Sequence, residues 1–247
     1  MLQIFRQCSL RFFRLSKWVS LAALFAFGTQ ASLAAQGIQA ATLTVCPTGC
    51  DHTTIQGAIT AASPGDTIQL ATTAPHTEYD IVVTKNVTIQ GLGGSIKNIV
   101  QAAASQGTAP GRVFTIQTGV VATIQDLEIR YGVSSLGGGI YNDGGNLTLN
   151  NVEVSRNARS GIYNAGTMTI TDAVVSGNLS REVSEKPVGG NGGGICNTGT
   201  LVVVNSVVCE NDGEDRGAGV FNDGVLTLTN TMICDNNTYD HDGGGIY

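Results

Sequence analysis

The stretch GGGIYNDGGNLTLNNVEVSRN, residues 137–157, decides the fold because much of it returns as SGIYNAGTMTITDAVVSGN in residues 160–178. Two later copies continue with TLVVVNSVVCEN (200–211) and VLTLTNTMICDN (225–236). Equivalent positions in successive copies are 22, 33, 25 and 26 residues apart, counted through Ile140, Ile162, Ile195, Val220 and Ile246. A repeat length in the twenties is typical of a stacked array.

Apolar residues alternate with polar or small ones in every copy, as in Leu147 and Leu149 or Met168 and Ile170. Alternation with a period of two is typical of a β-strand. No copy contains a helical stretch, which excludes solenoids built from helix pairs. Each copy is also too short for a propeller blade and lacks the turn signals of an antiparallel hairpin. The sequence therefore predicts an all-β parallel β-helix, in which each turn of the chain, here called a coil, stacks on the one before it.

Asparagine recurs at two positions of the repeat. Identical amides stacked about 4.8 Å apart can bond to one another and to turn backbone, which satisfies polar groups that are costly to bury. We therefore expect two asparagine ladders inside the coil. The first comprises Asn142, Asn164, Asn197 and Asn222, and the second comprises Asn157, Asn178, Asn211 and Asn236.

The segment before the repeats fits the same plan. Ile55, Ala58, Ile59 and Ala62 fall at helical spacing, so we expect a short capping helix over one end of the stack. We divide the β-helix, residues 42–247, into an N-terminal cap (about 42–70), irregular coils (about 71–136) and regular repeats (137–247). The sequence stops at HDGGGIY just as a new coil begins, and we expect the repeats to continue in a longer chain.

The alternation of GGGI with VSRN, VSGN, VCEN and ICDN is similar to the GGA(I/L/V) and FxxN repeats of the chlamydial polymorphic outer-membrane proteins and related bacterial surface proteins. Glycine stands for the motif alanine at Gly139 and Gly194. Valine or isoleucine stands for its phenylalanine at Val154, Val175, Val208 and Ile233. Together with the cap, the repeats resemble the pectin-lyase-like right-handed parallel β-helix superfamily. The resemblance implies a right-handed coil in either a polysaccharide lyase or hydrolase, or a non-enzymatic adhesin.

Residues 1–34 read as a secretory signal peptide. Arg6, Arg11, Arg14 and Lys17 precede the apolar run WVSLAALFAFG (18–28), and small residues follow, with cleavage expected after Ala34. The run is shorter than the roughly 20 residues that span a bilayer, so we expect no transmembrane segment. Removing the four basic residues from 13 leaves 9 against 19 acidic ones, a net charge of −10. Such an acidic chain is a poor partner for nucleic acid.

The cysteines agree with export. Cys46 and Cys50 lie close enough in CPTGC to close a small disulfide loop. Cys209 and Cys234 share a coil position, where a disulfide competes with two stacked thiols; we slightly favour the thiols, because parallel Cα–Cβ bonds make the torsion awkward. Cys196 lies at another coil position and is expected to be a free thiol or to have a partner not evident in the sequence.

No group of residues indicates catalysis. Asp143 and Asp223 share a coil position but are three coils apart, roughly 14 Å, too far to act together. Glu210, Asp212 and Asp235 form a weak calcium candidate with acidic residues of the following turns, although a solvated acidic surface accounts for them better. We expect no other cofactor. Tyr141, Tyr163 and Phe221 form an aromatic row that either is exposed for stacking or packs over a corner.

The sequence favours an exported, non-catalytic β-helix repeat protein, a structural or adhesion module at the cell surface, in the outer membrane or outside the cell. Its expected partners are surface polysaccharides or proteins of host or neighbouring cells. The alternative is a carbohydrate-active enzyme, a polysaccharide lyase or glycoside hydrolase, whose catalytic residues are unrecognised or lie beyond residue 247.

Overall fold

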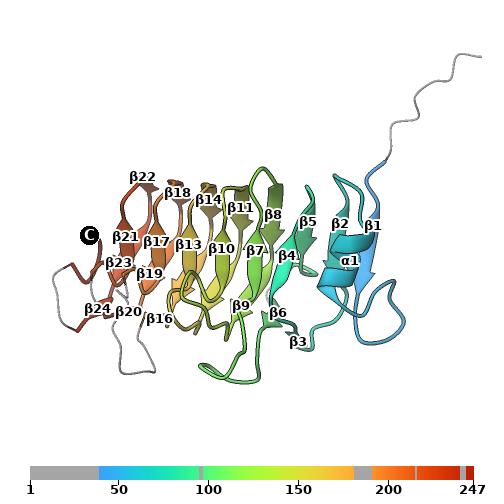
Figure 1. The fold of residues 1–247 in the computed structure, drawn as a ribbon, viewed down its shortest axis with the longest axis horizontal. Helices are drawn as coiled ribbons and strands as arrows, with labels where there is room; N and C mark the ends of the chain where they lie inside the picture. Colours follow the sequence, from blue (N-terminus) through green and yellow to red (C-terminus); the bar gives the residue numbers. More distant parts are fainter. Residues whose placement is uncertain (1–38, 95–96, 181–190, 215, 240–242) are drawn as a thin grey trace, which may run out of the picture. The chain divides into compact units, whose positions relative to one another are not determined.

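The computed structural model describes residues 39–94, 97–180, 191–214, 216–239 and 243–247. This part of the chain is an all-β parallel solenoid of about 7 turns with a short helix near its N-terminal end, as the sequence predicts (Figure 1). The expected signal peptide, residues 1–34, lies outside the described residues. Within the described part no helix is long and apolar enough to cross a membrane.

Two long sheets hold most of the strands. Sheet A contains, in spatial order, β1 (Thr42–Val45), β2 (Thr67–Leu70), β5 (Thr88–Gln90), β8 (Val121–Gln125), β11 (Asn146–Asn150), β14 (Thr167–Thr171), β18 (Thr200–Val204) and β22 (Val225–Thr229). Sheet B contains β3 (His76–Thr77), β6 (Asn98–Gln101), β9 (Leu127–Arg130), β12 (Glu153–Ser155), β15 (Val174–Ser176), β19 (Val207–Cys209) and β23 (Met232–Cys234).

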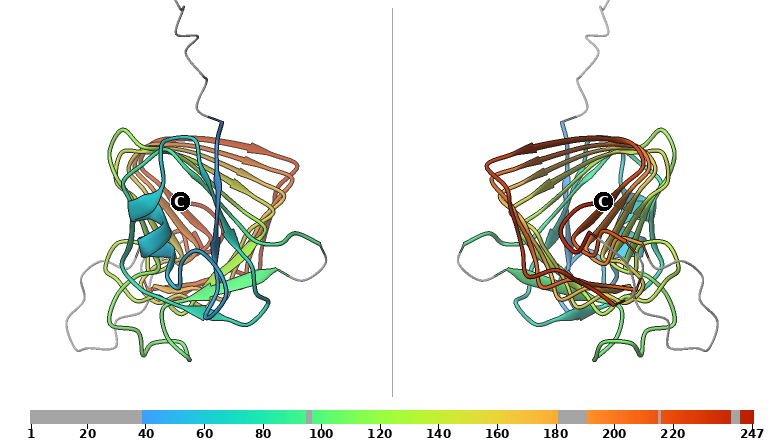
Figure 2. Two further views of the ribbon diagram at one scale, coloured as in Figure 1. Left: turned by 90° about the vertical axis from the view of Figure 1, so that its right-hand side faces the viewer. Right: turned by 90° about the vertical axis from the view of Figure 1, so that its left-hand side faces the viewer.

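Two further sheets complete the coil. Sheet C contains β4 (Ile81–Val83), β7 (Phe114–Ile116), β10 (Ile140–Asn142), β13 (Ile162–Asn164), β17 (Ile195–Asn197) and β21 (Val220–Asn222). The short sheet D contains β16 (Leu179–Ser180), β20 (Asp212–Gly213) and β24 (Asn237–Thr238). Neighbouring strands are parallel, and each regular coil passes through sheets A, B and C in turn, around a common interior (Figure 2).

The interior is built from rows of aliphatic side chains, one residue per coil. Strands place alternate residues on opposite faces, so every second position of a strand points inward. One inward row of sheet A is fully buried from β2 to β18 and contains Ile68, Ile89, Ile124, Leu149, Ile170 and Val203. These residues belong to one continuous apolar core that extends along the stack. Burial of this core is the main source of stability.

The glycine run that opens each repeat has a local cause. Gly137 adopts φ 62°, a conformation that L-residues rarely tolerate. A Cβ added to the next residue, Gly138, would collide with the carbonyl oxygen of Ala158 in the following coil. The run therefore marks a corner where neighbouring backbones approach too closely for a side chain.

Two sets of contacts cover the strand edges at the N-terminal end of the stack. Helix α1 (Ile55–Ala61) lies beside β4, the first strand of sheet C. Its Gln56 side chain accepts a hydrogen bond from the Val82 amide at 2.7 Å and donates to the Val82 carbonyl at 3.3 Å, as a neighbouring strand would. On β1, the outward backbone groups of Thr44 bond to the Asp51 carboxylate and the His52 amide. Both strand edges are thus shielded from edge-to-edge pairing.

Candidate functional site

The first predicted asparagine row lies inside the corner between sheets C and A. Asn142 donates from Nδ2 to Asn164 Oδ1 at 2.8 Å, Asn164 to Asn197 at 2.7 Å, and Asn197 to Asn222 at 2.7 Å. The first three members are fully buried. Each of these three also donates to a backbone carbonyl of the next coil, at Thr167, Thr200 and Val225. The row therefore ties successive coils together through buried amides.

The second predicted row lies beyond sheet B. Asn157 donates from Nδ2 to Asn178 Oδ1, Asn178 to Asn211, and Asn211 to Asn236, each at 3.0 Å. Each acceptor oxygen also takes the backbone amide of the donating residue. Because the first three of these amides are fully buried as well as bonded to one another, the row does not present a polar site to a ligand.

A third row, made of aspartate and asparagine, was missed from the sequence. It lies at the corner between sheets A and B and comprises Asp126, Asn151, Asp172, Asn205 and Asn230, with φ between 47° and 58°. Aspartate and asparagine tolerate this left-handed conformation better than other side chains. A signal was available, because each member directly follows a strand of sheet A. The row was concealed because it mixes aspartate with asparagine.

The structure contains two disulfides. Cys46 and Cys50 are bridged with their Cα atoms 5.6 Å apart. Cys209 and Cys234 are also bridged, with a Cα separation of 4.6 Å, so our preference for stacked thiols at this pair is wrong. Neighbouring coils bring the two residues within the normal disulfide range. Cys196 is a buried free thiol, and burial together with the charge of Asp223 raises its pKa to about 12.

The described residues of the calcium candidate do not form a metal site. Among the described residues, no three His, Cys, Asp or Glu side chains lie close enough to hold a metal ion. Glu210 and Asp235 occupy successive left-handed turn positions after sheet B, whereas Asp212 enters sheet D. Asp215, Asp240 and Asp242, which the candidate drew on, lie outside the described residues. The geometry therefore gives no support to calcium binding by Glu210, Asp212 and Asp235.

The aromatic row on sheet C makes its contacts within the chain. The rings of Tyr141 and Tyr163 meet edge to face at 5.6 Å, and the Arg112 guanidinium lies 4.7 Å from the centre of the Tyr141 ring. The Tyr141 hydroxyl donates to Asp143 at 2.8 Å; burial, followed by this hydrogen bond, raises its pKa. Phe221 stacks on Tyr247 at 5.8 Å. The rings are half-buried rather than a free stacking platform.

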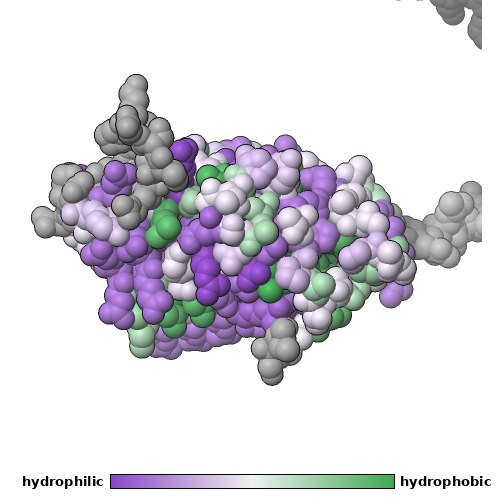
Figure 3. All heavy atoms as spheres, turned by 90° about the horizontal axis from the view of Figure 1, so that it is seen from below, coloured by the Kyte–Doolittle hydropathy of each residue, from purple (hydrophilic) through white to green (hydrophobic). Residues whose placement is uncertain are grey.

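A charged cluster on sheet B is likewise engaged internally. Glu128 Oε1 accepts hydrogen bonds from Arg130 at 3.2 Å and from Ser155 in the next coil at 3.1 Å. Arg156 lies 3.8 Å from the same oxygen. The cluster links neighbouring coils much as the asparagine rows do. Figure 3 shows hydrophilic residues prevailing on the side of the molecule that it presents, with scattered hydrophobic ones between them.

The outer face of sheet A differs from the charged cluster on sheet B in the chemistry of its side chains. Its outward side chains form three rows in register along the stack. The central row is Thr42, Thr67, Thr88, Thr123, Thr148, Thr169, Val202 and Thr227. One flanking row is Thr44, Gln69, Gln90, Gln125, Asn150, Thr171, Val204 and Thr229, and the other is Val121, Asn146, Thr167, Thr200 and Val225. None of these positions carries a charge.

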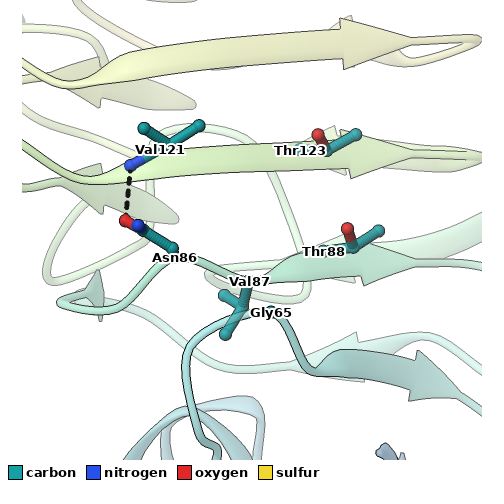
Figure 4. A pocket seen from close by; sticks show the side chains of 6 residues that line it. All are labelled: Gly65, Asn86, Val87, Thr88, Val121 and Thr123. Carbon is teal, nitrogen blue, oxygen red and sulfur yellow. Dashed lines mark hydrogen bonds between the residues drawn. The ribbon is translucent and has the colours of Figure 1, made fainter. Parts of the chain in front are cut away.

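A hollow of about 180 Å³ opens on this face between β5 and β8 (Figure 4). It arises because β8 begins at Val121, two residues before Thr123, the partner of Thr88 in β5. The chain before β5 bends away, and Asn86 Oδ1 accepts the Val121 amide at 2.8 Å. The hollow is lined by Gly65, Asn86, Val87, Thr88, Val121 and Thr123. Thr88 and Thr123 belong to the central row, so the hollow and the face form one site.

No family model matches the chain, and comparisons with curated proteins and with solved structures likewise found no match. The fold assignment therefore rests on the stacked coils that the structure shows. The outer face of sheet A is the candidate binding face, identified by its chemistry alone.

Proposed function

We propose that this chain is an exported, non-catalytic repeat protein that acts as a structural and adhesion module at the cell surface or outside the cell. We place it with the pectin-lyase-like β-helices, among proteins of the type of the chlamydial polymorphic outer-membrane proteins, on the repeat motifs. The observation that carries the proposal is the uncharged, in-register outer face of sheet A. An extended row of small polar side chains suits attachment over a long surface rather than chemistry at one point.

The scaffold behind the face supports this role. Buried amide rows and an interior aliphatic core join every regular coil to the next. A parallel stack joined in this way holds its outer rows at fixed spacing, which a repeated contact surface requires. Two disulfides support export, because such bonds persist in oxidising compartments. The basic and apolar pattern of residues 1–34 is the second argument for export.

Localisation and activity test the proposal. In the source cells, we expect the protein at the surface or in the medium, beginning after Ala34, and accessible to protease on intact cells. Deleting its gene is expected to reduce attachment of the cells to their substratum. Retention inside the cell with residues 1–34 attached would contradict the proposal. So would release of sugar fragments from a polysaccharide by the purified protein, if substituting one acidic or basic residue abolished that release without unfolding the chain.

A further inference from the structure

We propose that the outer face of sheet A binds a neutral, extended polysaccharide that lies along the solenoid axis, with one sugar unit seated in the hollow between β5 and β8. The inference rests on the proposed function as an adhesion module and names the ligand of its binding face. It follows from three properties of that face: its charge, its spacing and the chemistry of its side chains.

Charge indicates a neutral ligand. Across the eight strands of sheet A, every outward position is threonine, valine, glutamine or asparagine. The chain as a whole has 13% charged residues, whereas typical globular domains have about 25%. A ligand with carboxylate or sulfate groups would find no cation on this face to pair with. A neutral ligand avoids the cost of desolvating charges without partners.

Spacing indicates a polymer. Like residues on neighbouring strands are about 4.8 Å apart, and alternate residues along one strand are about 6.6 Å apart. From Thr42 to Thr169 the central row therefore repeats one hydroxyl-bearing side chain over five steps, or about 24 Å, before Val202 interrupts it. The step is close to the length of one pyranose unit in an extended chain. A polymer along the axis would thus meet nearly the same surroundings at every step, whereas a small ligand would use one step alone.

The side chains offer what sugars bind. Each threonine supplies a hydroxyl that both donates and accepts, beside a methyl group. The glutamines form a chain of amides: Gln125 donates to Gln90 at 3.0 Å, and Gln90 to Gln69 at 2.6 Å. These bonds fix the amide planes and reduce the entropy lost on binding. Val121, which is 52% exposed, adds apolar contact for the C–H face of a sugar ring at the hollow.

The hollow suits a single ring rather than a larger ligand. Its volume of about 180 Å³ is below the roughly 300 Å³ from which drug-sized ligand pockets begin. Its walls are uncharged, like the rest of the face. Because Thr88 and Thr123 belong both to the central row and to the hollow, a polymer that follows the row passes directly over it (Figure 4). The hollow would then fix the register of the chain along the face.

Binding of the purified full-length secreted protein to insoluble polysaccharides tests the inference. The probes are cellulose, chitin, β-1,3-glucan and mannan, with immobilised polygalacturonate as the acidic comparison. We expect saturable binding to at least one neutral probe, unchanged between about 0.1 M and about 1 M salt because no ion pair contributes. Binding to polygalacturonate alone, or to none of the neutral probes, would overturn the inference.

Matched variants locate the binding. The double variant Thr123→Lys with Thr169→Lys adds two charges to the central row. We expect its affinity for the polysaccharide to fall by about tenfold or more, because the bound ligand would cover ammonium groups that have no partners. Thr115→Lys with Val174→Lys adds the same charges to outward positions of sheets C and B and should leave binding unchanged. Circular dichroism and melting temperature check that both variants fold. Equal losses in the two variants would place the ligand elsewhere.

The two proposals fail in distinguishable ways. Surface exposure on intact cells without binding to a neutral probe would remove the ligand assignment and leave the adhesion module standing. Binding to a neutral probe by a protein that stays inside the cell would do the reverse.

Discussion

The regular coils and the N-terminal coils place different chemistry at the same position of the stack. In sheet C the inward row begins with Val83 and Ile116 and then becomes Asn142, Asn164 and the asparagines that follow. Both kinds of residue are buried. The change at β10, where Asn142 pairs with Ile116, shows that the coil accommodates either an aliphatic row or an amide row at this position.

Apart from the glutamine row of Gln69, Gln90 and Gln125 on the outer face of sheet A, the N-terminal coils use polar side chains once each instead of repeating them. Asp66 accepts the amides of Ala41 and Ser63, both at 2.7 Å. Glu78 accepts the amides of Ile55 and Gln56 at the start of α1. Each such contact closes a particular loop or helix end. The regular coils therefore depend on buried hydrogen-bond rows, whereas the ends and loops of the N-terminal coils depend on single anchors. The two regions should respond differently to perturbation.

The largest effect is expected from interrupting an amide row. Asn164 is fully buried, bonds to Asn142 and Asn197, and donates to the carbonyls of Gly166 and Thr200. Asn164→Ala leaves several of these groups without partners, at about 1 to 3 kcal/mol each. We expect the free energy of unfolding to fall by about 3 to 5 kcal/mol, measured by urea denaturation.

The matched control lies at the end of the same row. Asn222 is only partly buried and accepts from a single asparagine, Asn197. Asn222→Ala should therefore cost about 1 kcal/mol. Equal losses from the two variants would show that the row does not act as a shared structure.

The sequence predicts features that repeat from coil to coil better than contacts that occur only once. The rows at Asn142 and Asn157 were readable because one letter recurs at one position in every copy. The uncharged face was not recognised, because outward rows appear only when strands from different coils are aligned. The anchors made by Gln56, Asp66 and Glu78 occur once each, so no pattern marks them. The hollow could not be predicted because it arises from the offset between the starts of β5 and β8. The exact ends of strands are difficult to predict from a sequence.

The two disulfides should differ in how much they stabilise the fold, by less than the two asparagine variants differ. Cys209 and Cys234 join neighbouring coils across 25 residues, whereas Cys46 and Cys50 close a loop with a separation of 4. Loop entropy gives about 3.5 kcal/mol for the longer bridge and about 2 kcal/mol for the shorter one. Serine fits the longer bridge's row, since Ser155 and Ser176 already occupy it.

The double variants Cys209→Ser/Cys234→Ser and Cys46→Ser/Cys50→Ser should separate these effects by hydrogen exchange. We expect the first to speed exchange in β19 and β23 and the second in β1. If either variant instead loosened the whole solenoid uniformly, the coils would be unfolding as one unit rather than in regions.

The smallest effect is expected from acid, which should act on the N-terminal coils alone. Burial raises the pKa of Glu78, but hydrogen bonds from His76 and from the amides of Gln56 and Ile55 outweigh it and hold the pKa below the usual value. Backbone amides, of Thr44 for Asp51 and of Ser63 and Ala41 for Asp66, likewise lower the pKa of those carboxyls. A lowered pKa stabilises the fold above the ordinary value and loses that contribution as pH falls through the folded value.

Below about pH 4, near the ordinary values of these groups, α1 and β1 should exchange faster while β11 to β18 stay protected, because asparagine does not titrate. Glu78→Gln should remove part of this acid response and cost about 1 kcal/mol at neutral pH, since the amide oxygen accepts more weakly than a carboxylate. If acid instead accelerated hydrogen exchange first in the regular coils, the expected order of the two regions would be reversed. It would mean that the carboxylates of sheet B, and not the single anchors of the N-terminal end, limit the stability of the stack.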